Sequence, residues 1–110
     1  MKSNIGRKFR VIIDRPIGSS HPEYPDMIYP INYGYIPGVL GGDGEEQDAY
    51  IMGVDKPIEL FSGVVIAEVI RKNDNETKLV VAAEGESFSE EEILSAVNFQ
   101  EKFFDSRIII

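Results

Sequence analysis

The chain has 110 residues, of which 43% are hydrophobic and 27% are charged, and its formal net charge is −8. This length and this balance predict one globular domain over residues 1–110. The negative charge argues against nucleic acid as a partner, because binding to a phosphate backbone relies on clustered Lys and Arg. The absence of cysteine excludes disulfides, thiolate metal sites and a cysteine nucleophile.

The chain also lacks the features of a membrane or secreted protein. No apolar run approaches the roughly 20 residues that a bilayer-spanning helix needs. The first eight residues lack the apolar centre of a signal peptide. We therefore expect a soluble cytoplasmic protein with no membrane partner.

Residues 9–14 alternate between apolar and polar positions and predict a first strand, with Phe9, Val11 and Ile13 on one face. Pro16 ends this strand, and Asp14 at its end either points into a site or meets water. Residues 18–25 are dense in turn formers and predict a connection. That connection contains His21, which is interpreted as a packed or surface histidine, with a general base as the alternative.

An acidic, glycine-rich loop lies between two strand-like segments in the middle of the chain. It contains Asp43, Glu45 and Asp48. Carboxylates held close together repel one another unless a cation neutralises them, and Mg²⁺ prefers oxygen ligands. The loop is therefore a candidate metal site, and a solvated acidic turn is the alternative.

Further strands are predicted at residues 49–54, 63–71 and 78–83, with a tight turn over 72–76 that makes the last two a hairpin. Ser89 and Glu92 form a capping-box pattern, so a helix should run from Ser89 to about Phe104. Its expected buried stripe contains Ile93, Leu94, Val97 and Phe104. Residues 107–110 predict a last short strand.

These elements predict a mainly β (α+β) fold, a small five-stranded OB-like β-barrel with a C-terminal α-helix. Barrels of this kind host many functions, so the fold alone does not give the activity.

Two motifs together resemble a known family. The first is Tyr29-Pro30-Ile31-Asn32-Tyr33-Gly34-Tyr35-Ile36, and the second is Asp43-Gly44-Glu45-Glu46-Gln47-Asp48. The soluble, Mg²⁺-dependent inorganic pyrophosphatases of the OB-barrel type carry a Tyr-Pro-x-Asn-Tyr-Gly-Tyr segment followed shortly by an Asp-Gly-Asp-Pro-x-Asp type motif. The order and the separation match, and the similarity extends from Val11 to about Phe104. The chain resembles a shortened and divergent member.

The resemblance implies a role for each matching residue. Glu45 stands where the family has the aspartate that activates the attacking water, so it is the expected catalytic residue. Lys78 and Tyr33 match residues that contact the substrate. The expected Mg²⁺ ligands are Asp43, Asp48, Asp74, Glu76 and Asp14, with Asp74 alternatively only a turn residue.

The implied activity is that of a Mg²⁺-dependent inorganic diphosphatase, in which a metal-activated water hydrolyses pyrophosphate to phosphate. The implied partners are a small phosphate-containing substrate and further copies of the chain in a homo-oligomer.

Several departures from the family keep an alternative open. Glu45 is one methylene longer than the family's aspartate, and Phe103-Phe104 stand where the family has a Tyr-Lys pair that contacts phosphate. The segment 19–28 is shorter than the family's hairpin and lacks its basic residues. The alternative is a degenerate domain that acts on another phosphoanhydride, or that binds a metal–phosphate ligand or a protein partner without efficient turnover.

Overall fold

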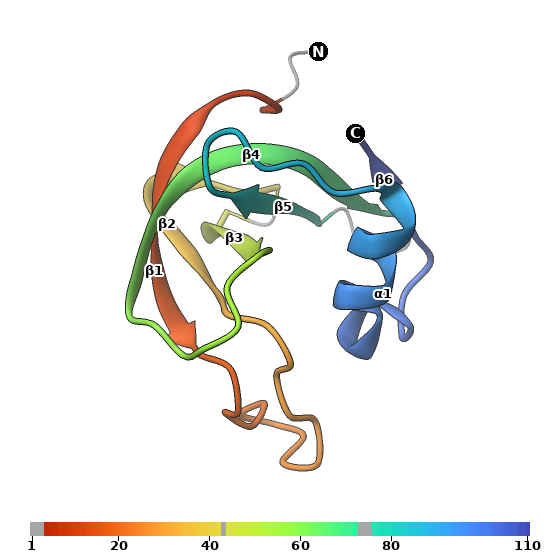
Figure 1. The fold of residues 1–110 in the computed structure, drawn as a ribbon. Helices are drawn as coiled ribbons and strands as arrows, with labels where there is room; N and C mark the ends of the chain where they lie inside the picture. The colour runs from red at the N-terminus through yellow and green to blue at the C-terminus, as the bar shows by residue number, and fades with distance from the viewer. Residues whose placement is uncertain (1–3, 43, 73–75) are drawn as a thin grey trace.

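The computed structural model describes residues 4–42, 44–72 and 76–110, and its centre is a closed β-barrel (Figure 1). The elements in chain order are β1 (Lys8–Arg15), β2 (Tyr33–Leu40), β3 (Glu46–Ile51), β4 (Leu60–Arg71), β5 (Thr77–Ala82), α1 (Glu90–Glu101) and β6 (Ser106–Ile109).

The barrel closes because β1 pairs with both β2 and β4. The strand order is β1-β2-β3-β5-β4, and β4 returns to β1. Among the strand pairings of the described residues, β3–β5 is the parallel one. β6 lies outside this ring and pairs antiparallel with β4. The predicted OB-like barrel with a C-terminal helix is confirmed.

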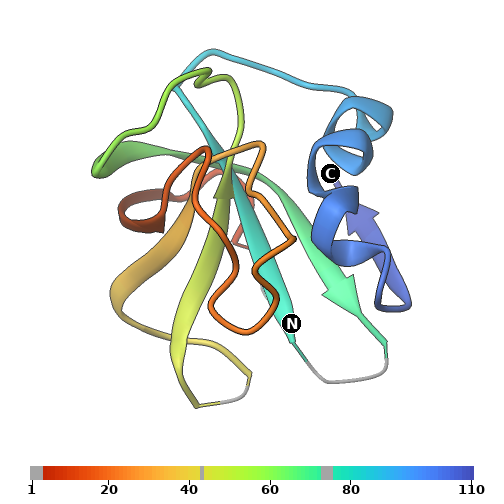
Figure 2. The same ribbon diagram turned by 90° about the horizontal axis from the view of Figure 1, so that it is seen from below.

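Two apolar clusters lie on opposite sides of the barrel wall. One fills the barrel interior, since it draws side chains from all five barrel strands: Val11, Ile13, Ile36, Ala49, Ile51, Val65, Leu79 and Val81. The other lies between the barrel wall and α1, because its members include Tyr33, Tyr50, Val69, Val80, Ile93 and Val97. Figure 2 shows α1 beside the barrel rather than across one of its ends.

Two β-bulges decide which side chains face the helix. In β4 the register shifts between Val65 and Ala67, so that Val65 packs in the interior and Ala67 packs under α1. In β1 the register shifts between Ile13 and Arg15, so Asp14 is the extra residue and Arg15 lies opposite Tyr33. The second bulge turns Arg15 towards the side of the barrel that α1 covers.

Two residues of the Tyr-Pro-x-Asn-Tyr-Gly motif, Asn32 and Gly34, stabilise the fold. The buried Asn32 accepts a hydrogen bond from the backbone N–H of Ile17 (3.0 Å) and donates one to the carbonyl oxygen of Lys56 (2.9 Å). Asn32 therefore ties together the segments after β1 and before β4. Gly34 is required by close packing, because a Cβ atom there would lie 1.9 Å from the carbonyl oxygen of Ile12.

The capping box of α1 is present as predicted: Ser89 accepts from the N–H of Glu92, and the Glu92 side chain accepts from the N–H of Ser89. Two expectations for this helix were wrong. It ends at Glu101 rather than near Phe104, and Leu94 is 47% exposed instead of buried. The buried positions continue from Val97 to Gln100 and Glu101 instead.

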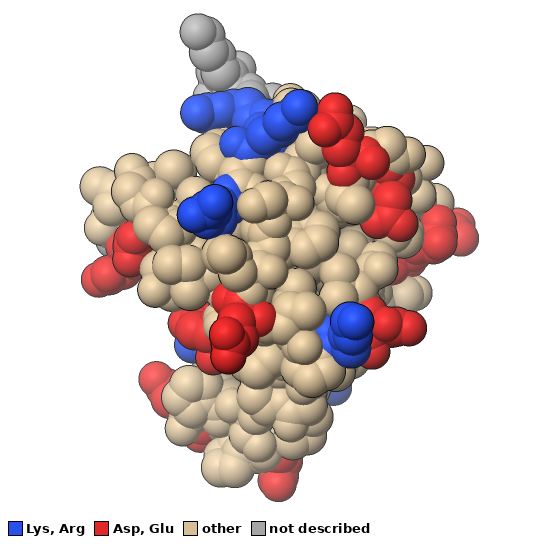
Figure 3. Space-filling view, turned by 60° about the vertical axis from the view of Figure 1, so that its left-hand side comes forward, with Lys and Arg blue, Asp and Glu red and all other residues tan. Residues whose placement is uncertain are grey.

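The other predicted strands form within three residues of their expected bounds, and the largest shift is that β3 lies at 46–51 instead of 49–54. No bounds were predicted for β2, because Pro37 and Gly38 near its end indicated a turn. On the face where β1 and β2 come forward, acidic and basic side chains alternate with broad uncharged areas (Figure 3). This face shows no continuous basic surface, in keeping with the net charge of −8.

Candidate active site

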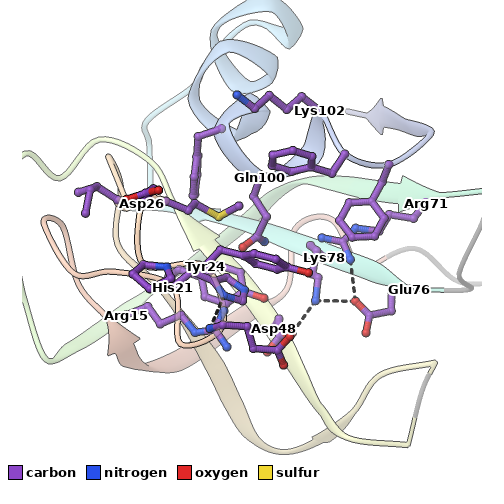
Figure 4. Close-up of a pocket in the computed structure, with 18 residues that line it drawn as sticks. Arg15, His21, Tyr24, Asp26, Asp48, Arg71, Glu76, Lys78, Gln100 and Lys102 are labelled. Carbon is purple, nitrogen blue, oxygen red and sulfur yellow. Dashed lines mark hydrogen bonds and ion pairs between the residues drawn. The ribbon is translucent and has the colours of Figure 1, made fainter.

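A cavity of about 1000 Å³ lies between the outer face of the barrel, the connection from β1 to β2 and the C-terminal end of α1. Figure 4 shows Arg15, His21 and Tyr24 on one side of it, Lys78, Glu76 and Arg71 on the other, and Asp48 between them. The remaining lining residues are Glu23, Pro25, Asp26, Met27, Ile28, Tyr33, Phe99, Gln100, Lys102, Phe103 and Phe104.

Lys78 is the charged centre of the cavity wall. Its Nζ lies 2.6 Å from Oδ2 of Asp48 and 2.7 Å from Oε2 of Glu76. The Lys78 side chain is 6% exposed, whereas those of Asp48 and Glu76 are 33% and 24% exposed. The ammonium thus lines the cavity at its base, and the two more exposed carboxylates hold two of its three donors. Alternation along β5 explains the position, because Lys78 shares its face with the helix-packed Val80.

Arg71, at the end of β4, joins this cluster to the helix. Its guanidinium binds both carboxylate oxygens of Glu101, with Nε–Oε1 at 2.9 Å and Nη2–Oε2 at 2.7 Å. Its Nη1 also lies 3.0 Å from Glu76. The ring of Phe104 lies 3.7 Å from the guanidinium carbon. A bidentate ion pair with a carboxylate, together with stacking on an aromatic ring, fixes the orientation of an arginine side chain.

A chain of hydrogen bonds continues from Glu101 across the helix to the opposite side of the cavity. The Tyr50 hydroxyl donates to Glu101 (2.6 Å) and accepts from Gln100 (2.7 Å). The side-chain amide oxygen of Gln100 accepts a hydrogen bond from the Tyr29 hydroxyl (2.7 Å). That hydroxyl in turn accepts a hydrogen bond from the Arg15 guanidinium (2.7 Å). Arg71 and Arg15 are therefore the two ends of one network that passes through buried residues.

Arg15 holds a positive charge beside two phenols. Its guanidinium carbon lies 5.3 Å from the ring centre of Tyr33 and 5.7 Å from that of Tyr29. Within residues 4–42, 44–72 and 76–110, no carboxylate lies within ion-pair distance of Arg15. Arginine in this setting can offer its remaining donors to an anion in the cavity.

The environment also sets the protonation of neighbouring groups. Burial raises the pKa of Tyr33 well above its ordinary value, and the charge of Asp48 and its hydrogen bond with the phenol add to the rise. Tyr33 is therefore a neutral donor at every working pH. Partial desolvation by the surrounding protein, with a smaller contribution from Asp48, raises the pKa of Asp14 even though its side chain is exposed, and Arg15 opposes this shift.

His21 lines the cavity and stacks on Tyr29, with ring centres 6.4 Å apart and an angle of 9°. Burial and the nearby positive charge of Arg15 lower its pKa, against an opposing effect of Glu23. Its Nδ1 accepts a hydrogen bond from the backbone N–H of Glu23 (3.0 Å). The neutral ring then carries its proton on Nε2, so His21 is available as a neutral donor.

The cavity brings together four of the residues predicted for the site: Tyr33, Asp48, Glu76 and Lys78. Two others do not line it. Asp14 is exposed at the β1 bulge, and Glu45 is exposed just before β3. Asp43 and Asp74 lie outside the described residues. Across the described part of the chain, no group of three or more acidic or histidine side chains converges as a metal cluster would require.

The sequence reasoning missed Arg71, Gln100 and Glu101 as parts of this site. One signal for the helix residues was available. One face of the helix carries Ile93 and, four, seven and eight residues later, Val97, Gln100 and Glu101. This face packs on the barrel, and two of its four residues are polar. A carboxylate at such a position needs a buried partner. Arg71 ends β4, whose residues are mostly apolar apart from Ser62 and Glu68.

No family model and no curated protein sequence matches the chain. Solved structures with the same fold do match. The inorganic pyrophosphatase from Ehrlichia chaffeensis has a TM-score of 0.70 and 17% identity, over 97% of this chain and 88% of that chain. The enzyme from Neisseria gonorrhoeae has a TM-score of 0.64 and 19% identity, over 86% and 72% of the two chains. The Helicobacter pylori enzyme has a TM-score of 0.62 and 17% identity, over 98% and 84%.

These similarities show that the chain has the fold of bacterial inorganic pyrophosphatases. In the described residues, no helix is long and apolar enough to cross a membrane.

Proposed function

We propose that the chain is a Mg²⁺-dependent hydrolase of the inorganic diphosphatase type and that it acts on pyrophosphate in this cavity. The observation that supports the proposal most strongly is that three cations and two carboxylates line the same cavity. The cations are Lys78, Arg71 and Arg15, and the carboxylates are Asp48 and Glu76. The shared fold with the pyrophosphatases makes phosphoanhydride hydrolysis the reaction to test first.

The cations of the wall provide binding energy for a small polyanion. Arg15 offers a planar guanidinium, and Lys78 offers an ammonium that Asp48 and Glu76 already hold in place. The neutral hydroxyl of Tyr33 and the neutral Nε2–H of His21 add hydrogen-bond donors that keep their protons near neutral pH. Together these groups surround an anion from two sides of the cavity.

The carboxylates that line this wall fit Mg²⁺ in a particular way. Mg²⁺ is commonly held by one or two carboxylates together with substrate phosphates, and it keeps several waters. Asp48 and Glu76 supply such a pair, and Lys78 contacts one oxygen of each of them, Oδ2 of Asp48 and Oε2 of Glu76. An ion held there would neutralise phosphate charge and lower the pKa of a bound water. The described residues thus suit an ion that arrives with the phosphate ligand.

In the reaction, a water oxygen forms a bond to one phosphorus while the bond from that phosphorus to the bridging oxygen breaks. The bridging oxygen leaves on the second phosphate, and the water loses a proton. We propose Glu45 as the base that takes this proton. That role rests on the resemblance alone, because Glu45 does not line the cavity.

The test is phosphate release from pyrophosphate with Mg²⁺, comparing the parent with Asp48→Asn and Glu45→Gln. We expect turnover in the parent and a loss of about 10²-fold or more in each variant. Glu59→Gln, an exposed acidic residue outside the cavity, is the matched control and should keep full activity. No turnover in the parent would contradict the proposal.

A second candidate is a domain that binds a phosphate ligand without turning it over. The specific observation in its favour is that the cavity carboxylates already pair with the protein's own cations: Asp48 with Lys78, and Glu76 with Lys78 and Arg71. Such a site can bind an anion with no added metal. Pyrophosphate binding that is unchanged by Mg²⁺, together with absent turnover, would favour this candidate.

A further inference from the structure

The cavity is much larger than a diphosphate, the group that we propose binds at its charged residues. Its volume of about 1000 Å³ stands at the upper end of the range of roughly 300–1,000 Å³ that is typical for drug-sized ligands. A bare diphosphate contacting Arg15 and Lys78 leaves most of this space to water. The remaining lining therefore bears on the identity of the ligand.

Much of the remaining lining of the cavity is apolar and aromatic. The C-terminal end of α1 and the residues after it provide Phe99 and Phe103, and the connection before β2 provides Tyr24, Met27 and Ile28. Tyr24 is 61% exposed and Phe103 is 63% exposed. Large aromatic side chains exposed at a cavity mouth are informative, because they bury further area only when a ligand arrives.

These aromatic residues belong to ordered structure. An isolated bridge joins Ser20 to Ile28, and the N–H of His21 donates to the carbonyl oxygen of Met27 (2.9 Å). The backbone carbonyl oxygen of Tyr24 accepts from the N–H of Met27 (2.9 Å). The centre of the Tyr24 ring lies 5.1 Å from that of His21. The connection is thus a closed hairpin that presents Tyr24 in a defined place, which lowers the entropic cost of binding.

Charge separates the two parts of the cavity. Arg15, Lys78 and Arg71 lie at the wall that holds Asp48, whereas Figure 4 shows Lys102 at the far end from Asp48. The hairpin adds two exposed carboxylates to the lining, Glu23 and Asp26. Carboxylates repel further phosphate groups, and they accept hydrogen bonds from hydroxyl and amino groups. These carboxylates therefore suit an organic group with such donors, and Lys102 adds one cation, with its ammonium 5.3 Å from the ring centre of Phe103.

We propose that the ligand of this cavity is a nucleoside diphosphate, with its diphosphate at the Arg15–Lys78 wall and its base against Tyr24 and Phe103. The inference rests on the proposed function for the placement of the diphosphate. It adds a nucleoside to the proposed ligand. A planar base would contact the aromatic residues, and the ribose and base would donate hydrogen bonds to Glu23 and Asp26.

The experiment is calorimetric titration of the full chain with ADP, pyrophosphate and adenosine, each in the presence of Mg²⁺, with ADP and pyrophosphate supplied as their methylene-bridged analogues so that hydrolysis adds no heat. We expect ADP to bind at least about tenfold more tightly than pyrophosphate, since stacking of a base on an aromatic side chain contributes on that scale. The double variant Tyr24→Ala, Phe103→Ala should lose most of this preference while its affinity for pyrophosphate stays unchanged.

Two further variants make the test specific. Tyr24→Phe, Phe103→Tyr keeps both rings and should retain the preference for ADP. Leu60→Ala, Leu94→Ala removes two side chains that are 49% and 47% exposed and lie outside the cavity, and it should bind all three compounds as the parent does.

The outcomes separate the two proposals. If pyrophosphate binds as tightly as ADP, or if the alanine pair weakens both to the same extent, the nucleotide proposal is overturned while the proposed function survives. If the parent binds neither compound, both are overturned.

Discussion

Lys78 is the residue on which the charge balance of the cavity wall depends. Its ammonium lies within 2.7 Å of both Asp48 and Glu76, and it lies 5.9 Å from the ring centre of Tyr33. Without it, two carboxylates would face each other across a short distance in a half-buried place. A phosphate ligand would then meet repulsion where it now meets a cation.

Replacing Lys78 with methionine should lower the free energy of unfolding by about 2–3 kcal/mol. The value is below the 3–5 kcal/mol typical of a fully buried pair, because Asp48 and Glu76 remain partly open to water. Urea unfolding measures this change. Lys8→Met is the matched control: its pair with Glu84 is 69% and 73% exposed, so the loss should stay below about 1 kcal/mol. Equal losses in the two variants would contradict the account.

Glu101 gives a prediction on pH. Burial acts to raise its pKa, but hydrogen bonds from Arg71, Tyr50 and Ser106 outweigh burial, so the pKa lies below its usual value. A lowered folded-state pKa stabilises the fold above the ordinary glutamate pKa, and the effect is lost as the pH falls through the folded-state value.

We therefore expect Glu101→Gln to be about 3 kcal/mol less stable than the parent at pH 7, with the difference shrinking as the pH is lowered towards about pH 2. Chemical unfolding of both proteins across that range measures it. Glu91→Gln, on the exposed side of α1, should follow the parent at every pH. A difference for Glu101→Gln that grows on acidification would contradict the assigned direction.

Among the secondary-structure elements, the β-bulges in β1 and β4 determine which side chains face the cavity and the helix. The bulge at Asp14 turns Arg15 to the side of Tyr33, and the bulge in β4 turns Ala67 and Val69 towards α1. Arg71 continues that alternation and so reaches Glu101. A regular strand would have sent these side chains to the opposite face.

The close approach of β1 and β2 gives a prediction on Gly34. A Cβ atom there would overlap the backbone of Ile12, and backbone cannot move aside as a side chain can. Gly34→Ala should cost about 3 kcal/mol or more in unfolding free energy. Gly38→Ala is the comparison, since nothing lies near its added Cβ and only its φ of +81° is unfavourable, at about 1 kcal/mol. Similar losses at the two glycines would show that Gly34 is not required by packing.

The sequence predicted the elements better than the site. Alternation, the hairpin pattern and the capping box are local signals, and β1, β4, β5 and α1 form where those signals lie. The bulges are not visible as local patterns, so neither Arg15 nor Arg71 was placed. The end of α1 was wrong for a related reason. Phe104 fits the helical stripe, but it leaves the helix and stacks on Arg71.

At the scale of the whole molecule, the cavity exists because the barrel and the helix share a second apolar cluster. That cluster holds α1 beside β3, β4 and β5, and the polar network from Arg71 to Arg15 runs along its edge. The motifs at Tyr29 and Asp48 predicted that the middle of the chain carries the site. They did not predict the part played by the helix, which requires contacts between residues about 50 positions apart, such as Tyr50 and Gln100.

The cations Lys78, Arg71 and Arg15 line the cavity in a chain whose net charge is −8, which supports the proposal that an anion binds there. The single-domain organisation and the homo-oligomeric assembly stay predictions. The roles of Glu45, Asp43 and Asp74 also stay predictions, the last two because they lie outside the described residues.

The central claim is that this chain hydrolyses a phosphoanhydride rather than only binding it, and phosphorus NMR tests it most directly. Pyrophosphate and Mg²⁺ are mixed with a comparable amount of protein, and the spectrum is followed with time. We expect the pyrophosphate signal to be replaced by orthophosphate, and Asp48→Asn to slow this conversion by about 10²-fold or more. A pyrophosphate signal that shifts or broadens on binding but is never converted would contradict it.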